Sequence, residues 1–190
     1  MRILFGLFCF YIPFLIFQIW LMFNGHENLW TGNIYSLLEF VVFATVFMEW
    51  NTNTNVKKTI KLSIIFTSIF WVMAKFSLEP ITRDAAITSP IETVVIIAIS
   101  MYTLIVLLRS TPESLFKNSK FWVSIGVILY GAGTLPLFLF FNRILALPLE
   151  VYAKMWSINW VLTIATNLLY SIALFCEAKG NPETLLGLSD

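Results

Sequence analysis

The chain has 190 residues, of which 58% are hydrophobic and only 12% are charged. A soluble domain carries about 25% charged residues, so this composition excludes a water-soluble globular protein and favours a membrane protein. The net charge of +1 and the lack of a long basic run give no reason to expect nucleic acid as a partner.

Six apolar stretches are long enough to cross a bilayer core as helices, which takes about 20 residues each. We expect an all-α fold, a bundle of six transmembrane helices over residues 1–178, with a polar tail at 179–190. The first stretch follows Arg2, but no small-residue cleavage site comes after it, so we expect an uncleaved helix rather than a signal peptide. In chain order the predicted spans are residues 3–23, 34–50, 59–76, 90–108, 121–141 and 151–176.

Local signals mark the predicted helix starts. Asn33 is expected to cap the second span. The sequence Ser89-Pro90-Ile-Glu92 is typical of a capping box with proline at the first helical position, so it predicts the start of the fourth span. Residues 110–116 predict a short interfacial helix between the fourth and fifth spans.

The basic residues predict an orientation. With six spans, eight of the twelve Lys and Arg residues fall on one side of the membrane and four on the other. Because short cytoplasmic loops carry the excess of Lys and Arg, both termini are expected in the cytoplasm.

Glu39 is a carboxylate inside the second apolar stretch. An ionised carboxylate in lipid costs on the order of 3 kcal/mol, so the side chain is expected to face other helices, find a partner or be protonated. Tyr35 and Ser36 share its helical face, and Glu39 would lie roughly 8 Å below Asn33 in the outer half of the span. Two interpretations stay open: a structural carboxyl that ties helices together, or a ligand or proton site in an outward-facing cavity.

The sixth span carries a line of polar residues. Asn159, Thr163, Asn167 and Tyr170 follow helical spacings of four, four and three. Polar stripes in membrane helices usually hydrogen-bond to neighbouring helices. The alternative is that this stripe forms a wall of the cavity that contains Glu39, with Asn159 at a comparable depth.

Two lysines near the outer ends of predicted spans also have two interpretations. Lys75 and Lys154 either extend toward lipid headgroups or reach the Glu39 carboxylate and keep it ionised. Glu79 lies in a loop with Arg83, and we interpret that loop as a solvated surface.

The fifth span contains two glycines, Gly126 and Gly133, that are seven residues apart and share a face. Glycines at such spacing let another helix approach closely. The expected helix-packing and polar seam consists of Gly126, Tyr130, Gly133, Thr163, Asn167 and Tyr170.

No catalytic pattern is present in the sequence. It contains no G-x-S-x-G, no H-E-x-x-H and no P-loop, and its cysteines, Cys9 and Cys176, do not form a CxxC pair. The single histidine, His26, cannot supply the three or four ligands of a zinc site. We therefore expect no enzyme, no metal and no cofactor.

Three stretches carry a resemblance. They are "NLWTGNIYSLLEF" (28–40), "FWVSIGVILYGAGTLPLFLFF" (121–141) and "WSINWVLTIATNLLYSIALF" (156–175). They resemble a family of small, uncharacterised polytopic bacterial inner-membrane proteins that share an N-x-Y-S-L-x-E-F, an F-W-x-x-x-G-x-x-x-Y and an N-x-L-Y element. The resemblance implies a bacterial inner membrane and a link to membrane signalling, and its elements fall on Asn33, Tyr35, Glu39, Trp122, Gly126, Tyr130, Asn167 and Tyr170.

From these features we predict a non-enzymatic signalling or accessory protein. A ligand or lipid would enter an outward pocket lined by Tyr35, Glu39 and Asn159. The expected partners are the lipid bilayer and either a membrane protein or a second copy of the chain. One alternative is a small transporter or channel with Glu39 as a proton or cation site. The other is a structural subunit that packs along Gly126 and Gly133.

Overall fold

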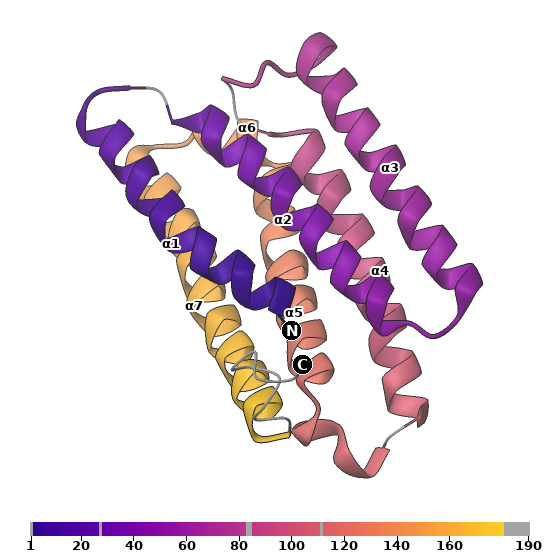
Figure 1. Ribbon diagram of the computed structural model, residues 1–190. Helices are drawn as coiled ribbons and strands as arrows, with labels where there is room; N and C mark the ends of the chain where they lie inside the picture. Colours follow the sequence, from indigo (N-terminus) through magenta and orange to yellow (C-terminus); the bar gives the residue numbers. More distant parts are fainter. Residues whose placement is uncertain (1, 27, 83–84, 111, 181–190) are drawn as a thin grey trace. The chain divides into compact units, whose positions relative to one another are not determined.

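The computed structural model describes residues 2–26, 28–82, 85–110 and 112–180. Within these ranges the chain is helical and contains no strand, so the all-helical prediction is confirmed (Figure 1). The elements are α1 (Arg2–Phe23), α2 (Leu29–Trp50), α3 (Thr54–Ser77), α4 (Thr88–Ser110), the 3-10 helix η1 (Pro112–Lys117), α5 (Ser119–Leu139), α6 (Phe141–Leu145) and α7 (Leu149–Gly180).

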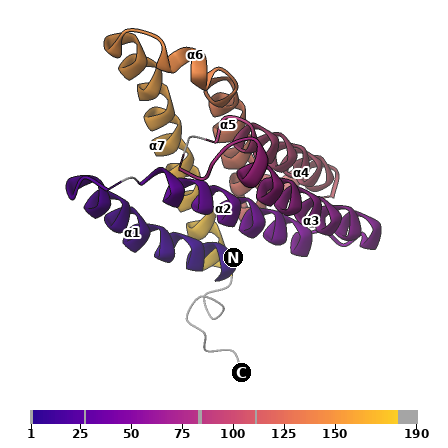
Figure 2. The same cartoon turned by 90° about the horizontal axis from the view of Figure 1, so that it is seen from above.

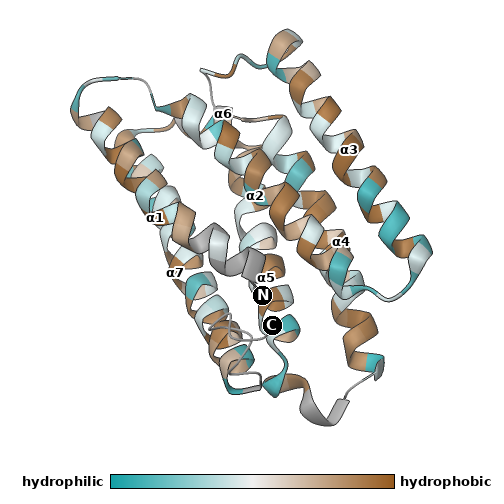
Figure 3. Cartoon of the chain, viewed as in Figure 1, coloured by the Kyte–Doolittle hydropathy of each residue, from teal (hydrophilic) through white to brown (hydrophobic). Residues whose placement is uncertain are grey.

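Five of these helices, α2, α3, α4, α5 and α7, are long and apolar enough to cross a membrane. Hydrophobic residues cover most of their length, whereas hydrophilic turns gather toward one end of α3 (Figure 3). Helix α1 contains a shorter apolar stretch, Cys9–Leu21. The described helices therefore fit a multi-pass membrane protein.

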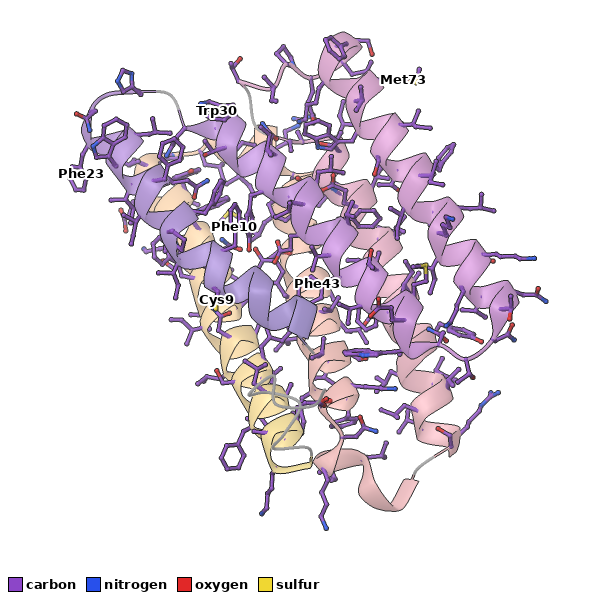
Figure 4. All side chains as sticks on the ribbon, viewed as in Figure 1. Cys9, Phe10, Phe23, Trp30, Phe43 and Met73 are labelled. Carbon is purple, nitrogen blue, oxygen red and sulfur yellow. The ribbon has the colours of Figure 1, made fainter. Side chains whose placement is uncertain are left out.

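Large apolar side chains cover the outer surfaces of the helices. Phe23 at the end of α1 and Met73 on α3, both labelled in Figure 4, are 81% and 64% exposed. A soluble monomer does not expose contiguous apolar surface on this scale, whereas lipid tails solvate it at no cost. The exposed apolar surface therefore agrees with the membrane assignment.

The chain divides into two compact units, and the division falls inside α4. The N-terminal unit is Ile3–Val95 and holds α1, α2, α3 and the first turns of α4. The C-terminal unit is Ile96–Asp190 together with Met1–Arg2, and it holds the rest of α4, η1, α5, α6 and α7.

In the N-terminal unit, α2 lies between α1 and α3 (Figures 1 and 2). Phe43, Ala44 and Phe47 of α2 are buried, and so are Trp71 and Ala74 of α3. The spacings of three and four residues put each set on one helical face, so the C-terminal half of α2 carries an apolar stripe.

In the C-terminal unit, α5 packs along α7. A Cβ atom at Gly126 would lie 2.6 Å from Cε1 of Tyr170, and one at Gly133 would lie 2.5 Å from Cδ1 of Leu162. No real Cβ atom tolerates such distances, so both positions use the missing side chain of glycine. The close approach of Tyr170 and Leu162 to these glycines agrees with their predicted use in helix packing.

Several predicted helix ends are wrong. Because α2 begins at Leu29, Asn33 lies inside the helix and does not cap it. Because α4 begins at Thr88, Ser89 is not its N-cap. The start of α4 is instead held by Glu79, whose carboxylate accepts the Ile87 backbone N–H at 2.7 Å.

The C-terminal ends differ as well. The fifth predicted span, 121–141, runs past the end of α5 at Leu139, and a short α6 follows. The sixth, 151–176, lies inside the longer α7, Leu149–Gly180. Of the predicted polar tail 179–190, the first two residues belong to α7 and 181–190 lie outside the described residues.

Candidate functional site

Glu39 lies near the midpoint of α2. The helix starts at Leu29 and ends at Trp50, so Glu39 is about 15 Å from its first residue at 1.5 Å per residue. Glu39 is therefore further from the start of its helix than the sequence predicts, because α2 begins at Leu29 and not beside Asn33. A carboxyl near the middle of an apolar helix is costly and calls for an explanation.

Glu92, near the start of α4, is the acidic residue whose charge acts on Glu39. The Glu92 side chain is buried, with 4% of the residue exposed, and Oε2 accepts a short hydrogen bond from the Ser36 hydroxyl of α2. Its other oxygen, Oε1, is buried without a hydrogen-bond partner. The charges of Glu39 and Glu92 interact. The sequence assigned Glu92 to a capping box, and that assignment is wrong.

Lys75 forms the only basic part of this cluster among the described residues. Its Nζ donates to Glu79 Oε1 at 2.6 Å and to Asn33 Oδ1 at 3.0 Å. The amide of Asn33 in turn donates to the Ile81 carbonyl at 2.7 Å. These bonds tie the end of α3 and the following loop to α2. The interpretation of Lys75 as a headgroup-facing or Glu39-pairing lysine is wrong, because its ion-pair partner is Glu79.

Glu79 is buried, with 6% of the residue exposed, so the interpretation of its loop position as a solvated surface is wrong. Burial alone would raise the pKa of Glu79. Hydrogen bonds from Lys75, Thr88 and the Ile87 backbone, together with the charge of Lys75, outweigh that effect and leave its pKa below the ordinary value. Glu79 is therefore a stable partner for Lys75.

The charges in this part of the N-terminal unit do not balance. Three carboxyl groups, those of Glu39, Glu79 and Glu92, lie with one ammonium group, that of Lys75, and the shortest ion pair of Lys75 is with Glu79. Lys75 also interacts with Glu92 through its charge. Among the described residues no salt bridge reaches Glu39 or Glu92. The cluster has more acidic than basic groups, so a bound cation would balance its charge.

Helix α1 forms another side of this region. Tyr11, Phe14 and Gln18 follow helical spacing and face α2. The Gln18 amide donates to the Thr31 hydroxyl at 2.9 Å, and the Phe14 and Tyr35 rings stack with centroids 5.1 Å apart. Since Thr31, Tyr35 and Glu39 are each four residues apart on α2, Glu39 continues the face that α1 contacts.

The residues of the predicted seam on α5 and α7 differ in their contacts. The Thr163 hydroxyl donates to the Asn159 carbonyl of its own helix at 2.8 Å, and Asn167 is exposed. Tyr170 is buried against Gly126, as described above. Tyr130 lies half-buried on α5, and its backbone carbonyl accepts the Thr134 hydroxyl one turn later.

Asn159 belongs to the C-terminal unit, whereas Tyr35 and Glu39 belong to the N-terminal unit. Its Oδ1 atom is buried without a hydrogen-bond partner. A pocket that Asn159 shares with Glu39 stays a prediction. Lys154, the other lysine considered for Glu39, pairs with Glu150 of its own helix at 2.7 Å on an exposed surface.

Sequence reasoning missed three residues of the cluster: Ser36 as a donor to Glu92, Glu92 itself, and Glu79. A signal existed for one of them, because Lys75 and Glu79 have the i, i+4 spacing of a helical ion pair. The Ser36–Glu92 bond joins residues 56 positions apart, and no local pattern indicates it.

The described residues contain no group of three or more His, Cys, Asp or Glu side chains that could hold a metal ion. In comparisons with known proteins, no family model, no curated protein and no solved structure matches this chain.

Proposed function

We propose that the protein is a small, non-enzymatic cation transporter of the bacterial inner membrane that holds its cation between Glu39 and Glu92. The observation that carries this proposal is Glu92, a carboxyl that is 4% exposed and whose Oε1 atom has no hydrogen-bond partner. A buried, half-satisfied carboxyl costs stability unless a ligand or proton completes it.

The position of Glu39 supports the same function. Acidic residues within membrane-spanning helices are rare because of their cost, and they mark ion pathways and proton relays. Glu39 lies mid-helix, its charge interacts with that of Glu92, and Lys75 is already committed to Glu79. A bound cation would offset the excess acidic charge.

The membrane arrangement belongs to the proposal. We assign six spans, with α1 as the first, and place both termini in the cytoplasm on the Lys and Arg distribution. The loop between α3 and α4 then faces outward, and the network of Asn33, Lys75 and Glu79 lies at the outer end of the unit. A cation would enter from that side.

A flux assay tests the proposal. Purified full-length protein is reconstituted in liposomes, and uptake of protons, Na⁺, K⁺ and choline is measured under an imposed membrane potential. We expect potential-driven uptake of at least one of these cations, and we expect Glu39→Gln to abolish it. Glu150→Gln serves as the matched control, since Glu150 is an exposed glutamate paired with Lys154.

Two results would overturn the transporter assignment. One is the lack of any cation flux through wild-type protein that is folded and correctly inserted. The other is flux that Glu39→Gln leaves unchanged. Cation binding without flux would favour the sensory or accessory function that the sequence predicts, because a receptor uses the same site without a path across the membrane.

A further inference from the structure

The proposed cation site is bordered by aromatic rings from two helices. The ring of Tyr35 lies with its centroid 5.2 Å from that of Tyr11 and 5.1 Å from that of Phe14. Tyr35 is one helical turn from Glu39, and the phenol of Tyr11 interacts electrostatically with the Glu39 carboxyl. Acidic and aromatic groups therefore lie together at the α1–α2 contact.

Aromatic and acidic groups together select among classes of cation. Ca²⁺ takes six to eight oxygen ligands, and Mg²⁺ needs near-ideal octahedral oxygen geometry. The described residues contain no acidic cluster of that kind. An ammonium group that carries alkyl substituents holds water weakly, and it is attracted both to the face of an aromatic ring and to a carboxylate.

The rings are only partly buried, and one carboxyl has an unsatisfied oxygen. Tyr11, Phe14 and Tyr35 are half-buried, and the Tyr35 ring contacts the rings of the other two. Glu92 contributes a buried oxygen, Oε1, that lacks a hydrogen-bond partner. The site thus offers ring surface and uncompensated acidic charge without a fixed basic partner at Glu39.

We propose that the N-terminal unit binds a quaternary ammonium group, with Glu39 and Glu92 as counter-charges and the rings of Tyr11 and Tyr35 as contacts for its methyl groups. This inference rests on the proposed cation site and names the class of its ligand. The ammonium group belongs either to a free small molecule or to the headgroup of a lipid.

The test measures choline binding to the purified full-length protein by isothermal titration calorimetry in a detergent without ammonium groups. The reference ligand is the neutral isostere of choline, in which carbon replaces nitrogen. We expect choline to bind and the isostere to bind at least about tenfold more weakly. Tyr35→Leu should weaken choline binding about tenfold, which is the loss of one cation–π contact at a desolvated site.

Matched variants separate a ring contact from a general effect of losing a tyrosine. Tyr102→Leu is the control, since Tyr102 lies on α4 in the C-terminal unit and is 40% exposed. Tyr35→Phe keeps the ring and should rescue binding relative to Tyr35→Leu. If Tyr35→Leu does not fold, Tyr11→Leu tests the same contact from α1.

A comparison of two lipids distinguishes a free ammonium ligand from a lipid headgroup. The titration is repeated in nanodiscs of phosphatidylcholine and of phosphatidylglycerol. Weaker choline binding in phosphatidylcholine indicates that the lipid headgroup occupies the site, and equal binding indicates a free ligand. Either result supports the ammonium assignment.

The assignment is overturned if choline binds no better than its neutral isostere, or if Tyr35→Leu and Tyr11→Leu both bind choline as wild type does. Failure here is distinguishable from failure of the proposed function. If proteoliposomes still take up protons, Na⁺ or K⁺ in a manner that requires Glu39, the transporter stands and its ligand is a different cation.

Discussion

The two units of the chain use different means to join their helices. In the N-terminal unit, polar and charged side chains bond between helices, as in the contacts of Lys75 with Asn33 and of Ser36 with Glu92. In the C-terminal unit, α5 and α7 meet through glycines that lie against Tyr170 and Leu162, and a hydrogen bond from the Ser119 hydroxyl to Glu177 also joins them. Close packing of this kind stabilises membrane helices without polar groups.

Glycine packing can join two helices without an ion pair, so the charges of the N-terminal unit call for a further explanation. If they served only to join helices, each carboxyl would be paired, as Glu79 is with Lys75. Glu92 retains an unpartnered oxygen, and no salt bridge among the described residues reaches Glu39. We therefore assign Glu79 to stability and the pair Glu39 and Glu92 to ligand binding.

The largest expected effect separates two ion pairs of the same spacing. Lys75 and Glu79 are buried, with side chains 4% and 6% exposed, whereas Lys154 and Glu150 are 74% and 79% exposed. Removing one partner of a buried pair leaves an uncompensated charge, so Glu79→Gln should lower the free energy of unfolding by about 3 kcal/mol or more. Thermal unfolding of the purified protein measures this.

The exposed pair is the control for that experiment. Glu150→Gln should change the unfolding temperature little, because exposed pairs contribute little to stability. Equal effects of Glu79→Gln and Glu150→Gln would show that the network around Lys75 does not hold the N-terminal unit together.

The second prediction concerns the glycine contacts. Gly126→Ala places a methyl group against the Tyr170 ring, which is buried, so it should destabilise the protein by about 1–3 kcal/mol. Gly133→Ala meets the end of a flexible leucine that can rotate away, so its effect should be smaller. Unfolding of both variants in detergent ranks them.

Gly32→Ala provides the reference for these substitutions in the N-terminal unit. A Cβ atom there would lie 3.8 Å from Nε2 of Gln18, an ordinary contact, and alanine is the better helix former. We expect no loss of stability. A loss as large as that of Gly126→Ala would mean that glycine packing is as important in the N-terminal unit as in the C-terminal unit.

A third prediction is a dependence of stability on pH. The folded-state pKa of Glu79 lies below its ordinary value of 4.5. Its contribution to stability is therefore fully present above that value and is lost as pH falls through the lower folded-state pKa. Unfolding temperatures of wild type and Glu79→Gln, followed downward from neutral pH, should converge at acidic pH. A constant difference would contradict the assignment.

The smallest expected effect on stability is that of Glu92→Gln. The amide retains an oxygen that accepts the Ser36 hydroxyl, and it removes a buried carboxyl that is only half satisfied. The free energy of unfolding should change by less than about 1 kcal/mol or increase. A large loss, measured by thermal unfolding, would mean that Glu92 stabilises the fold as Glu79 does and is not reserved for a ligand.

The sequence predicts some of these features better than others. Apolar stretches predict the helices because a membrane span needs a continuous run of apolar residues, which is visible in the local sequence. The spacing of Gly126 and Gly133 is a local pattern too. The positions of Asn33 and Glu92 also match local capping patterns, yet both side chains bond to distant parts of the chain. Such bonds depend on which helices are neighbours, and the sequence alone does not specify that.

Glu39 illustrates both outcomes. Its polarity within an apolar stretch is visible in the sequence and identifies it as a candidate. Its depth depends on where α2 starts, and its acidic neighbour comes from α4. The candidate was therefore found from the sequence, whereas its surroundings required the fold.

The most direct test of a cation site at Glu39 and Glu92 is cation uptake by proteoliposomes that contain Glu92→Gln, at the same amount of folded protein as wild type. The account predicts that the variant unfolds at the wild-type temperature or above and has lost uptake. Wild-type uptake by the stable variant would contradict it, since Glu92 would then have no part in binding the cation.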